Sequence, residues 1–351
     1  MMARMHTPVS LSTPASTASP GRLAAPRIDW KQELAEAIRD PAELCRLLDL
    51  DPALAQAAAG GHRLFPFLVP RGFAARMRRG DPGDPLLLQV LPRAEELVDM
   101  PGFTTDPLDE QDARRAGGLL QKYASRALLL LTGACAVNCR YCFRREFPYA
   151  ESGATPAGTT AAVAAVAADP TLTEVILSGG DPLLLDDPRL DHLLDQLESI
   201  PHLRRLRIHS RLPVVLPSRI TPRLLTRLAG SRLTVSLVIH ANHAAELDET
   251  VATGLTDLTT AIPLRFNQAV LLKGINDSVH ALAMLSERLI SLGVVPYYLH
   301  LLDPVRGTAG FAVPDSRGQE LIESLRRRLP GYAVPRLARE LPGEPAKVWL
   351  A

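Results

Sequence analysis

The sequence predicts an α/β fold built on a parallel sheet. From Tyr123 onward, short runs of β-forming residues alternate with longer helical stretches, and each pair takes roughly 30 residues, as a βαβ unit requires. The strand-like runs are rich in Val, Ile and Leu and lack a polar alternation, which is typical of strands buried on both faces. Six such repeats predict either a curved partial barrel or a doubly wound sheet.

The chain before these repeats is predicted to be a helical extension. Residues 1–27 contain much Ser, Thr, Pro and Ala, no acidic residue and no apolar signal segment, so we expect a disordered tail or a misassigned start codon. Residues 28–121 are expected to form a helical region, with short helices and loops from Gly60 to Glu110. Its clearest helical stretch runs from Asp29 to Leu50. One apolar face of that stretch would be formed by Leu34, Ile38, Leu44, Leu47 and Leu48.

The repeats themselves supply six strands with helices between and after them. The predicted strands are Ala127–Thr132, Glu174–Ser178, Leu203–His209, Leu233–His240, Leu264–Leu271 and Pro296–Leu302. Thr155-Pro156 and Thr221-Pro222 each place a capping side chain before a proline at the first helical position. Ser316 with Gln319 predicts a capping box at the start of the last long helix.

Composition and charge exclude several classes of protein. The chain has 351 residues and a net charge of +1, which argues against nucleic-acid binding and against a polybasic membrane anchor. No apolar run approaches the roughly 20 residues of a membrane helix. Three of the four cysteines fall within eight positions, which indicates a metal site in a reducing, cytoplasmic compartment and not a disulfide framework.

The clustered cysteines are Cys135, Cys139 and Cys142, in a C-x3-C-x2-C spacing after the first predicted strand. Thiolates are soft ligands that suit iron–sulfur clusters or zinc. Three cysteines would leave one iron of a four-iron cluster open to a substrate group. The alternative is a zinc site completed by Cys45 or a nearby His. Cys45 itself lies in an amphipathic segment and is expected to be a small buried apolar residue.

This cysteine spacing, placed after strand one of a six-fold β/α repeat, resembles the radical S-adenosylmethionine (SAM) superfamily. The resemblance implies a partial (β/α)6 TIM-like barrel, a [4Fe–4S] cluster that binds SAM, and an external electron donor such as flavodoxin or ferredoxin. A second motif, Ser178-Gly179-Gly180-Asp181, ends the second predicted strand. Glycines let the backbone approach a ligand closely, and the resemblance places this motif against SAM.

Within the superfamily, the chain from about Ile28 onward resembles lysine 2,3-aminomutases, which also use pyridoxal 5′-phosphate (PLP). Residues 122–351 would then form the radical SAM barrel with a C-terminal segment carrying the PLP lysine. The matching motifs are Lys122-Tyr123-Ala124-Ser125-Arg126, Phe143-Arg144-Arg145, Arg207 to Val215, and Pro342 to Lys347.

The resemblance implies a role for each matched residue. Lys347 would bind PLP covalently, and Tyr123, Arg126 and Arg211 would surround PLP and its phosphate. His240 and Gln268 match pocket residues near the cofactors. Arg144 would hold the carboxylate of L-lysine, since a guanidinium binds a carboxylate bidentately. Asp303 would hold its ε-ammonium together with Glu340, which stands where the family has an aspartate.

Two departures narrow the resemblance further. Lysine-catabolic members carry a C-terminal zinc extension and a cysteine after Asn-Asp, whereas here Asn276-Asp277 is followed by Ser278 and the chain ends soon after Lys347, so no such zinc site is expected. The compact length, the cysteine motif, Pro148-Tyr149-Ala150-Glu151 and Gly343-Glu344-Pro345 resemble the branch that modifies elongation factor P. That branch converts (S)-α-lysine into (R)-β-lysine, which a ligase similar to lysyl-tRNA synthetase attaches to the factor.

Two alternatives stay open at this point. The same chemistry on another amino acid, such as glutamate, is the nearer one, although an acidic pocket suits an ammonium better. The other is a non-catalytic scaffold stabilised by an iron–sulfur cluster or by zinc.

Overall fold

One curved sheet of nine strands organises the computed structural model, which describes residues 29–149 and 151–351. The tail expected over residues 1–27 lies outside the described residues, as does Ala150. The strands are β1 (Leu119–Tyr123), β2 (Arg126–Leu130), β3 (Glu174–Ser178), β4 (Arg205–Ser210), β5 (Thr234–Ile239), β6 (Leu264–Val270), β7 (Val295–His300), β8 (Arg336–Arg339) and β9 (Val348–Trp349).

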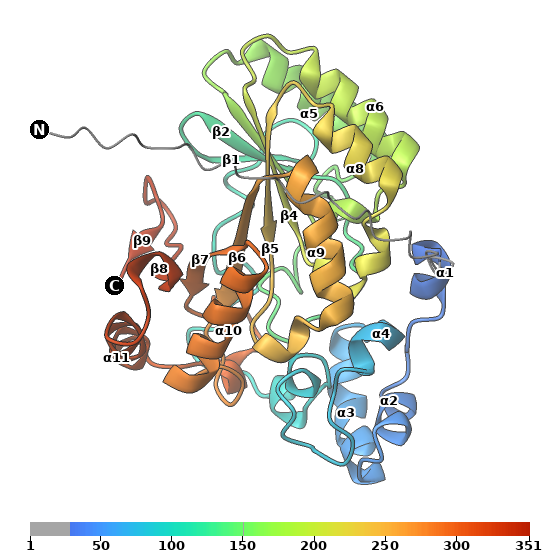
Figure 1. Ribbon diagram of the computed structural model, residues 1–351, viewed down its shortest axis with the longest axis vertical. Coiled ribbons are helices and arrows are strands. Elements are labelled where there is room, and N and C mark those ends of the chain that lie inside the picture. The colour runs from blue at the N-terminus through green and yellow to red at the C-terminus, as the bar shows by residue number, and fades with distance from the viewer. Residues whose placement is uncertain (1–28, 150) are drawn as a thin grey trace, which may run out of the picture.

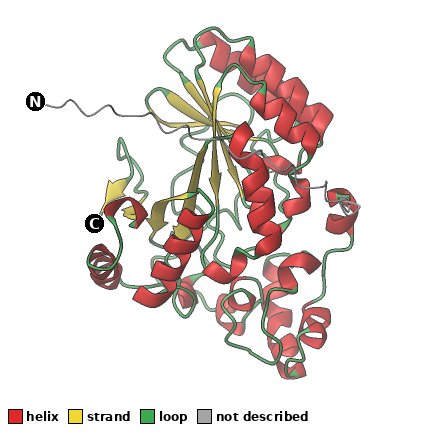
Figure 2. Ribbon diagram, viewed as in Figure 1, coloured by secondary structure: helices red, strands yellow, loops and turns green. Residues whose placement is uncertain are grey.

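The strand order decides between the two predicted architectures. The strands pair in sequence order from β1 to β9, and β2 to β8 are all parallel, while β1 and β9 pair antiparallel at the two edges. A doubly wound sheet would reverse its order at a switch point. The chain is therefore a partial β/α barrel, with helices along the outer face of the strands (Figure 2).

All six predicted strands are present within a few residues of their expected ends. The prediction lacked β1, β8 and β9. The expected boundary at residue 121 falls inside β1, so the sheet begins at Leu119 and not in the next segment.

The helices of the barrel follow the strands in regular alternation. They are α5 (Pro156–Ala168), α6 (Asp187–Glu198), α7 (Leu212–Val215), α8 (Pro222–Ala229), α9 (Glu249–Ala261), α10 (Val279–Ser291) and α11 (Asp315–Arg326). Thr155 and Thr221 cap α5 and α8 as predicted. The capping box at Ser316 was wrong, because α11 begins at Asp315 after the N-cap Pro314, which leaves Ser316 inside the first turn.

The N-terminal region is helical, but its first stretch is not one helix. It contains α1 (Trp30–Ala35), α2 (Pro41–Leu47), α3 (Pro52–Leu64) and α4 (Arg71–Ala74), drawn in blue to cyan in Figure 1. Pro41 begins a new helix at its first position, with Asp40 as the cap, and this divides the predicted segment. Leu47 is 42% exposed, so it does not belong to the predicted apolar face. None of the described helices is long and apolar enough to span a membrane.

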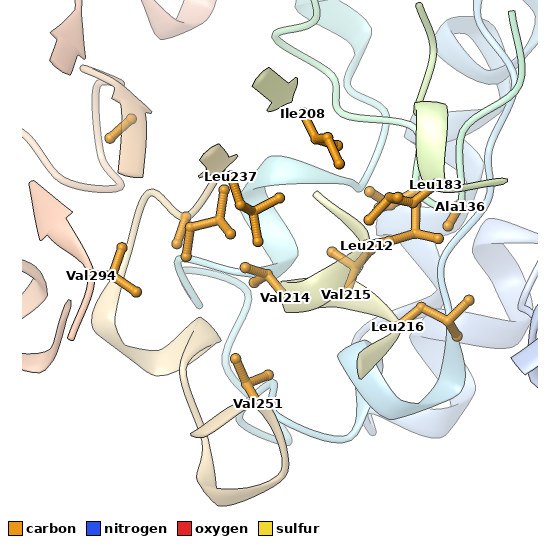
Figure 3. Close-up of a cluster of buried hydrophobic side chains, with 14 of the residues drawn as sticks. Ala136, Leu183, Ile208, Leu212, Val214, Val215, Leu216, Leu237, Val251 and Val294 are labelled. Atoms are coloured by element: carbon orange, nitrogen blue, oxygen red, sulfur yellow. The ribbon is translucent and has the colours of Figure 1, made fainter. Parts of the chain in front are cut away.

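Both regions share one hydrophobic core. Ile38, Phe73 and Leu87 of the N-terminal region belong to the same buried cluster as Leu129 and Leu237 of the sheet. Figure 3 shows part of this cluster, with Ile208 and Leu237 from the strands, residues of α7 and Val251 of α9. The N-terminal region is therefore fixed against the barrel, and its polar residues can take part in the site.

Candidate active site

A cavity of about 640 Å³ lies inside the barrel and extends to the carboxyl ends of the strands, and every site residue predicted from the sequence lines it. These residues come from positions 123 to 347, and they include the three clustered cysteines, Arg144, the Ser178–Asp181 motif, Asp303 and Lys347. In a β/α barrel the carboxyl ends of the strands carry the chemistry. The fold therefore assembles into one chamber a set of residues that the sequence places far apart.

The cysteine loop follows β2 and forms one wall of the cavity. Burial raises the pKa of the Cys135 thiol, and it raises the pKa of Cys142 to about 11. The guanidinium of Arg211 donates a hydrogen bond to Cys139 Sγ at 2.6 Å. Among the described residues, no three His, Cys, Asp or Glu side chains already stand at metal-binding geometry.

This donor set fits an iron–sulfur cluster better than zinc. Three thiols from one short loop face a common cavity, which leaves room for a cluster larger than a single ion. Cys45, the proposed fourth zinc ligand, is only 2% exposed in α2 and belongs to the hydrophobic core, as predicted. It does not line the cavity.

The glycines after β3 are required by close packing against the cysteine loop. Gly179 has a φ of +127°, and a Cβ there would stand 2.4 Å from the carbonyl oxygen of Thr132. A Cβ on Gly180 would stand 2.1 Å from the carbonyl oxygen of Ala134. Any side chain at either position would therefore displace the loop that carries the cysteines.

Asp181 joins the ends of β3 and β4. Its carboxylate accepts hydrogen bonds from Ser210 Oγ and from the backbone N–H of Arg211, both at 2.7 Å. Burial raises the pKa of Asp181 to about 6, and these donors oppose that rise. The structure thus gives this residue a positioning role for the segment that carries Arg211.

Arg144 is oriented by a residue that the sequence did not indicate. Its Nε and Nη2 each donate to the carboxylate of Glu110 at 2.7 Å, and its Nη1 lies 3.1 Å from Ser178 Oγ. One N–H on each terminal nitrogen remains for a second carboxylate. Glu110 stands in the loop-rich segment before β1, where no local pattern marks it.

Next to this pair, Glu340 links two lysines, one of which, Lys122, also lies 3.8 Å from Glu110. Glu340 lies 2.8 Å from Lys122 Nζ and 3.2 Å from Lys347 Nζ. Burial opposes its ionisation, yet the two lysines lower the pKa of Glu340 to about 2. Glu340 was predicted to hold the substrate ammonium, but here it is already paired within the protein. Lys122 was not predicted as a site residue.

Asp303 is the carboxylate that remains unpaired. Its side chain makes no hydrogen bond or ion pair with any described residue, and it lines the cavity. Burial raises the pKa of Asp303 to about 7, with Lys347 acting in the opposite direction. Asp303 is therefore available to pair with a cation inside the cavity.

The arginines predicted around PLP separate into two places. Arg126 lies 4.5 Å over the ring of Tyr123 and pairs with no carboxylate among the described residues, so it is available to an anion. Arg211 instead contacts Cys139 and pairs with Glu246 at 2.9 Å. These contacts place Arg211 at the cysteine wall, where it does not share the surroundings of Tyr123 and Arg126.

Two further predicted residues lie at the ends of the middle strands. His240 bonds Tyr141 Oη at 2.9 Å, and burial lowers the pKa of His240 to about 3, so the ring is neutral. The side-chain amide of Gln268 faces the cavity without a hydrogen-bond partner in the described chain. His209 lines the cavity too, with a buried Nε2 that has no partner there.

Comparisons with known proteins agree with this geometry. Residues 124–203 match a family model described as a 4Fe-4S single cluster domain. The chain is 51% identical to the L-lysine 2,3-aminomutase of Escherichia coli over 92% of this chain and 94% of that one. It is 44% identical to the enzyme of the same name from Haemophilus influenzae, over 92% and 96% of the two chains. With the Clostridium subterminale enzyme the identity is 35%, over 90% of this chain and 76% of that one.

Identity at this level over nearly the whole chain shows the family. It makes the chain an isomerase, and it implies a [4Fe–4S] cluster, SAM and PLP as cofactors. The chain belongs to the L-lysine 2,3-aminomutase family.

Proposed function

We propose that the chain converts (S)-α-lysine into (R)-β-lysine. The observation that carries this proposal is the charge of one cavity, which is lined by a guanidinium with free donors, Arg144, and by an unpaired carboxylate, Asp303. Lysine has a carboxylate at one end and an ammonium at the other. A buried pocket that binds it must pair both, because an unpaired buried charge is costly.

The cofactors divide the cavity between them. When bound, the cluster and SAM supply a carbon-centred radical, and PLP supplies a conjugated ring that stabilises radical character while the amino group moves. Cys135, Cys139 and Cys142 would hold the cluster, and Arg211, His240 and the Ser178–Asp181 motif stand on that side. Lys347 would hold PLP, with Arg126 as a phosphate partner.

The residues of the chain then bind, orient and shelter the substrate. Arg144, held in place by Glu110, would take the carboxylate through its two remaining N–H groups. Asp303 would bind the ε-ammonium. Glu340 would assist, although its carboxylate is also paired with Lys122. Glutamate would bring its second carboxylate next to Asp303, which disfavours it as the substrate.

We further propose that the product serves the modification of elongation factor P. The support is the resemblance of the cysteine motif, of Pro148 to Glu151 and of Gly343-Glu344-Pro345 to that branch. The partners would be an external electron donor, and a ligase similar to lysyl-tRNA synthetase that accepts (R)-β-lysine.

Anaerobic incubation of the reconstituted enzyme with lysine, SAM and a reductant tests the reaction. We expect chiral chromatography to show (R)-β-lysine, and parallel incubation with glutamate to show no β-amino acid. Adding the ligase and elongation factor P should increase the mass of the factor by one lysyl group. Formation of β-glutamate would overturn the assignment of lysine as the substrate. An iron-loaded chain without turnover would favour the alternative of a non-catalytic scaffold.

The raised pKa of Asp303 predicts a pH dependence. Below a pH of about 7, Asp303 is protonated and cannot pair with an ammonium, whereas above it the carboxylate is charged. The lysine ε-ammonium, with a pKa of about 10.4, keeps its charge throughout this range. We therefore expect kcat/KM for lysine to rise as the pH increases through about 7. Asp303→Asn, measured at the same pH values, should lose this rise, and a persisting rise would assign it to another group.

Lys347 is predicted to carry the cofactor. Borohydride reduction of the PLP-loaded enzyme, followed by peptide mapping, should place the pyridoxyl label on Lys347. Lys122 is the natural competitor, because both lysines contact Glu340. Lys347→Ala should remove the label, and Lys122→Met should retain it. A label on Lys122 would reverse the roles of the two lysines.

A further inference from the structure

A buried group of three charges anchors the cysteine loop to the N-terminal region. We call Glu96, Arg140 and Arg145 the anchoring triad. Arg140 Nε lies 2.9 Å from one carboxylate oxygen of Glu96, and Arg145 Nη2 lies 2.8 Å from the other. All three side chains are at most 2% exposed. The function described above uses none of them.

The guanidinium N–H groups that do not bond Glu96 donate to backbone carbonyl oxygens, which are uncharged. Arg140 donates to the carbonyl oxygens of Gly61, Phe65 and Pro66 at 2.9–3.1 Å. Arg145 donates to the carbonyl oxygen of Arg140 at 3.0 Å. Together with the bonds to Glu96, the bonds to carbonyl oxygens satisfy all five N–H groups of Arg140, but a carbonyl group carries no net charge. The triad therefore buries two positive charges against one negative charge.

The two buried arginines that line the cavity nearest the cysteines are balanced. Arg144 is matched with Glu110, and Arg211 with Glu246. An uncompensated buried charge is strongly unfavourable unless a partner is supplied. A [4Fe–4S]²⁺ cluster held by three thiolates has a net charge of −1, and reduction by one electron makes it −2. Such a cluster would supply the missing negative charge.

The two arginines of the triad stand next to cluster ligands in the chain. Arg140 directly follows Cys139 in the chain. The backbone N–H of Arg145 donates to the carbonyl oxygen of Cys142 at 3.2 Å. Both arginines thus lie in or just after the short loop that carries the three thiolates, and their guanidinium groups contact Glu96 of the N-terminal region.

We propose that the anchoring triad is a fixed counter-charge that sets the reduction potential of the cluster. Its excess positive charge favours the reduced, more negative cluster, so that an external one-electron donor can convert the 2+ state to the 1+ state. The N-terminal region supplies Glu96, and through it takes part in the redox chemistry. This proposal rests on the cluster site and not on the identity of the substrate.

Two substitutions of opposite sign test the proposal in the reconstituted enzyme. Glu96→Gln raises the triad charge to +2, whereas Arg145→Gln lowers it to zero. Potentiometric titration followed by electron paramagnetic resonance should show a more positive potential for Glu96→Gln and a more negative one for Arg145→Gln. Removing a buried unit charge near the cluster should change the ratio of oxidised to reduced cluster by about tenfold at a fixed potential, or 59 mV for one electron.

Two control variants separate charge from structure. Arg145→Lys keeps the charge and should stay near the parent potential. Glu146→Gln alters the next residue, whose partner Arg306 is half-exposed, and solvent should screen its effect. Iron content and thermal melting are measured for every variant.

Shifts of the same sign in Glu96→Gln and Arg145→Gln, or no shift in either with full iron content, would show that the triad only anchors the loop. If Glu96→Gln does not retain its cluster, the test rests on the reduction potentials of Arg145→Gln and Arg145→Lys. A more negative potential in Arg145→Gln than in Arg145→Lys supports the proposal, and equal potentials overturn it. Opposite shifts in a chain that leaves lysine unchanged would overturn the proposed function and leave this inference standing.

Discussion

Replacing any one of Cys135, Cys139 and Cys142 by Ala is expected to abolish both cluster binding and turnover. Each thiolate supplies one iron ligand, and three are the minimum that leaves a single iron open for SAM. Among the described residues, no group of three His, Cys, Asp or Glu side chains offers a second, ready-made metal site. The measurement is iron and sulfide content after anaerobic reconstitution, with the β-lysine assay beside it.

Cys45→Ala is the matched control, because it removes the fourth cysteine from the hydrophobic core. It should retain the cluster and lose only some stability through the small cavity it creates. Full iron in any of the three loop variants would show that another group completes the site. Loss of iron in Cys45→Ala without unfolding would revive the four-ligand zinc alternative.

The second large effect is expected at Asp303. Asp303→Asn removes a charge with little change in volume, so the lost interaction is electrostatic. We expect kcat/KM for lysine to fall by the equivalent of roughly 2–5 kcal/mol, as for truncating one partner of a buried charge pair. Iron and PLP content should be unchanged.

Glu340→Gln provides the comparison for this effect. Glu340 already shares its charge with Lys122 and Lys347, so it has less to offer a substrate ammonium, and its removal should cost less. If Asp303→Asn turned over lysine like the parent, Asp303 would be only a polar residue at the end of the strand. If Glu340→Gln were the more damaging change, Glu340 would be the main ammonium partner.

The sequence predicted the repeating part of the fold because its signals are local. Each of the six strands is a run of apolar β-formers, and Thr155 and Thr221 mark helix starts through a cap followed by proline. The strands that escaped prediction are too short or too polar to form such a run: β8 reads RLAR, and β9 has two residues. Their formation depends on pairing with β7 and with each other.

The residues of the site fall into the same two groups, those with a local signal in the sequence and those without one. The cysteines and the Ser178–Asp181 motif are recognisable by spacing, and Lys347 by its resemblance to a known family. Glu110, Lys122 and Glu96 were not recognisable, because each acts through a partner distant in sequence. Arg211 shows how far a family resemblance can predict a site, because its contact with Cys139 is visible only in the folded structure.

The pair between Lys122 and Glu340 has a further consequence for how the enzyme matures. These residues are separated by 218 positions and join the first strand of the sheet to the segment after β8. The wall that contains Asp303, Glu340 and Lys347 is therefore complete only when the last strands have been synthesised and have docked. The cysteine loop is synthesised far earlier, when more than half of the chain is still to come. The thiols for the cluster are therefore present in the chain before the segment that completes this wall exists.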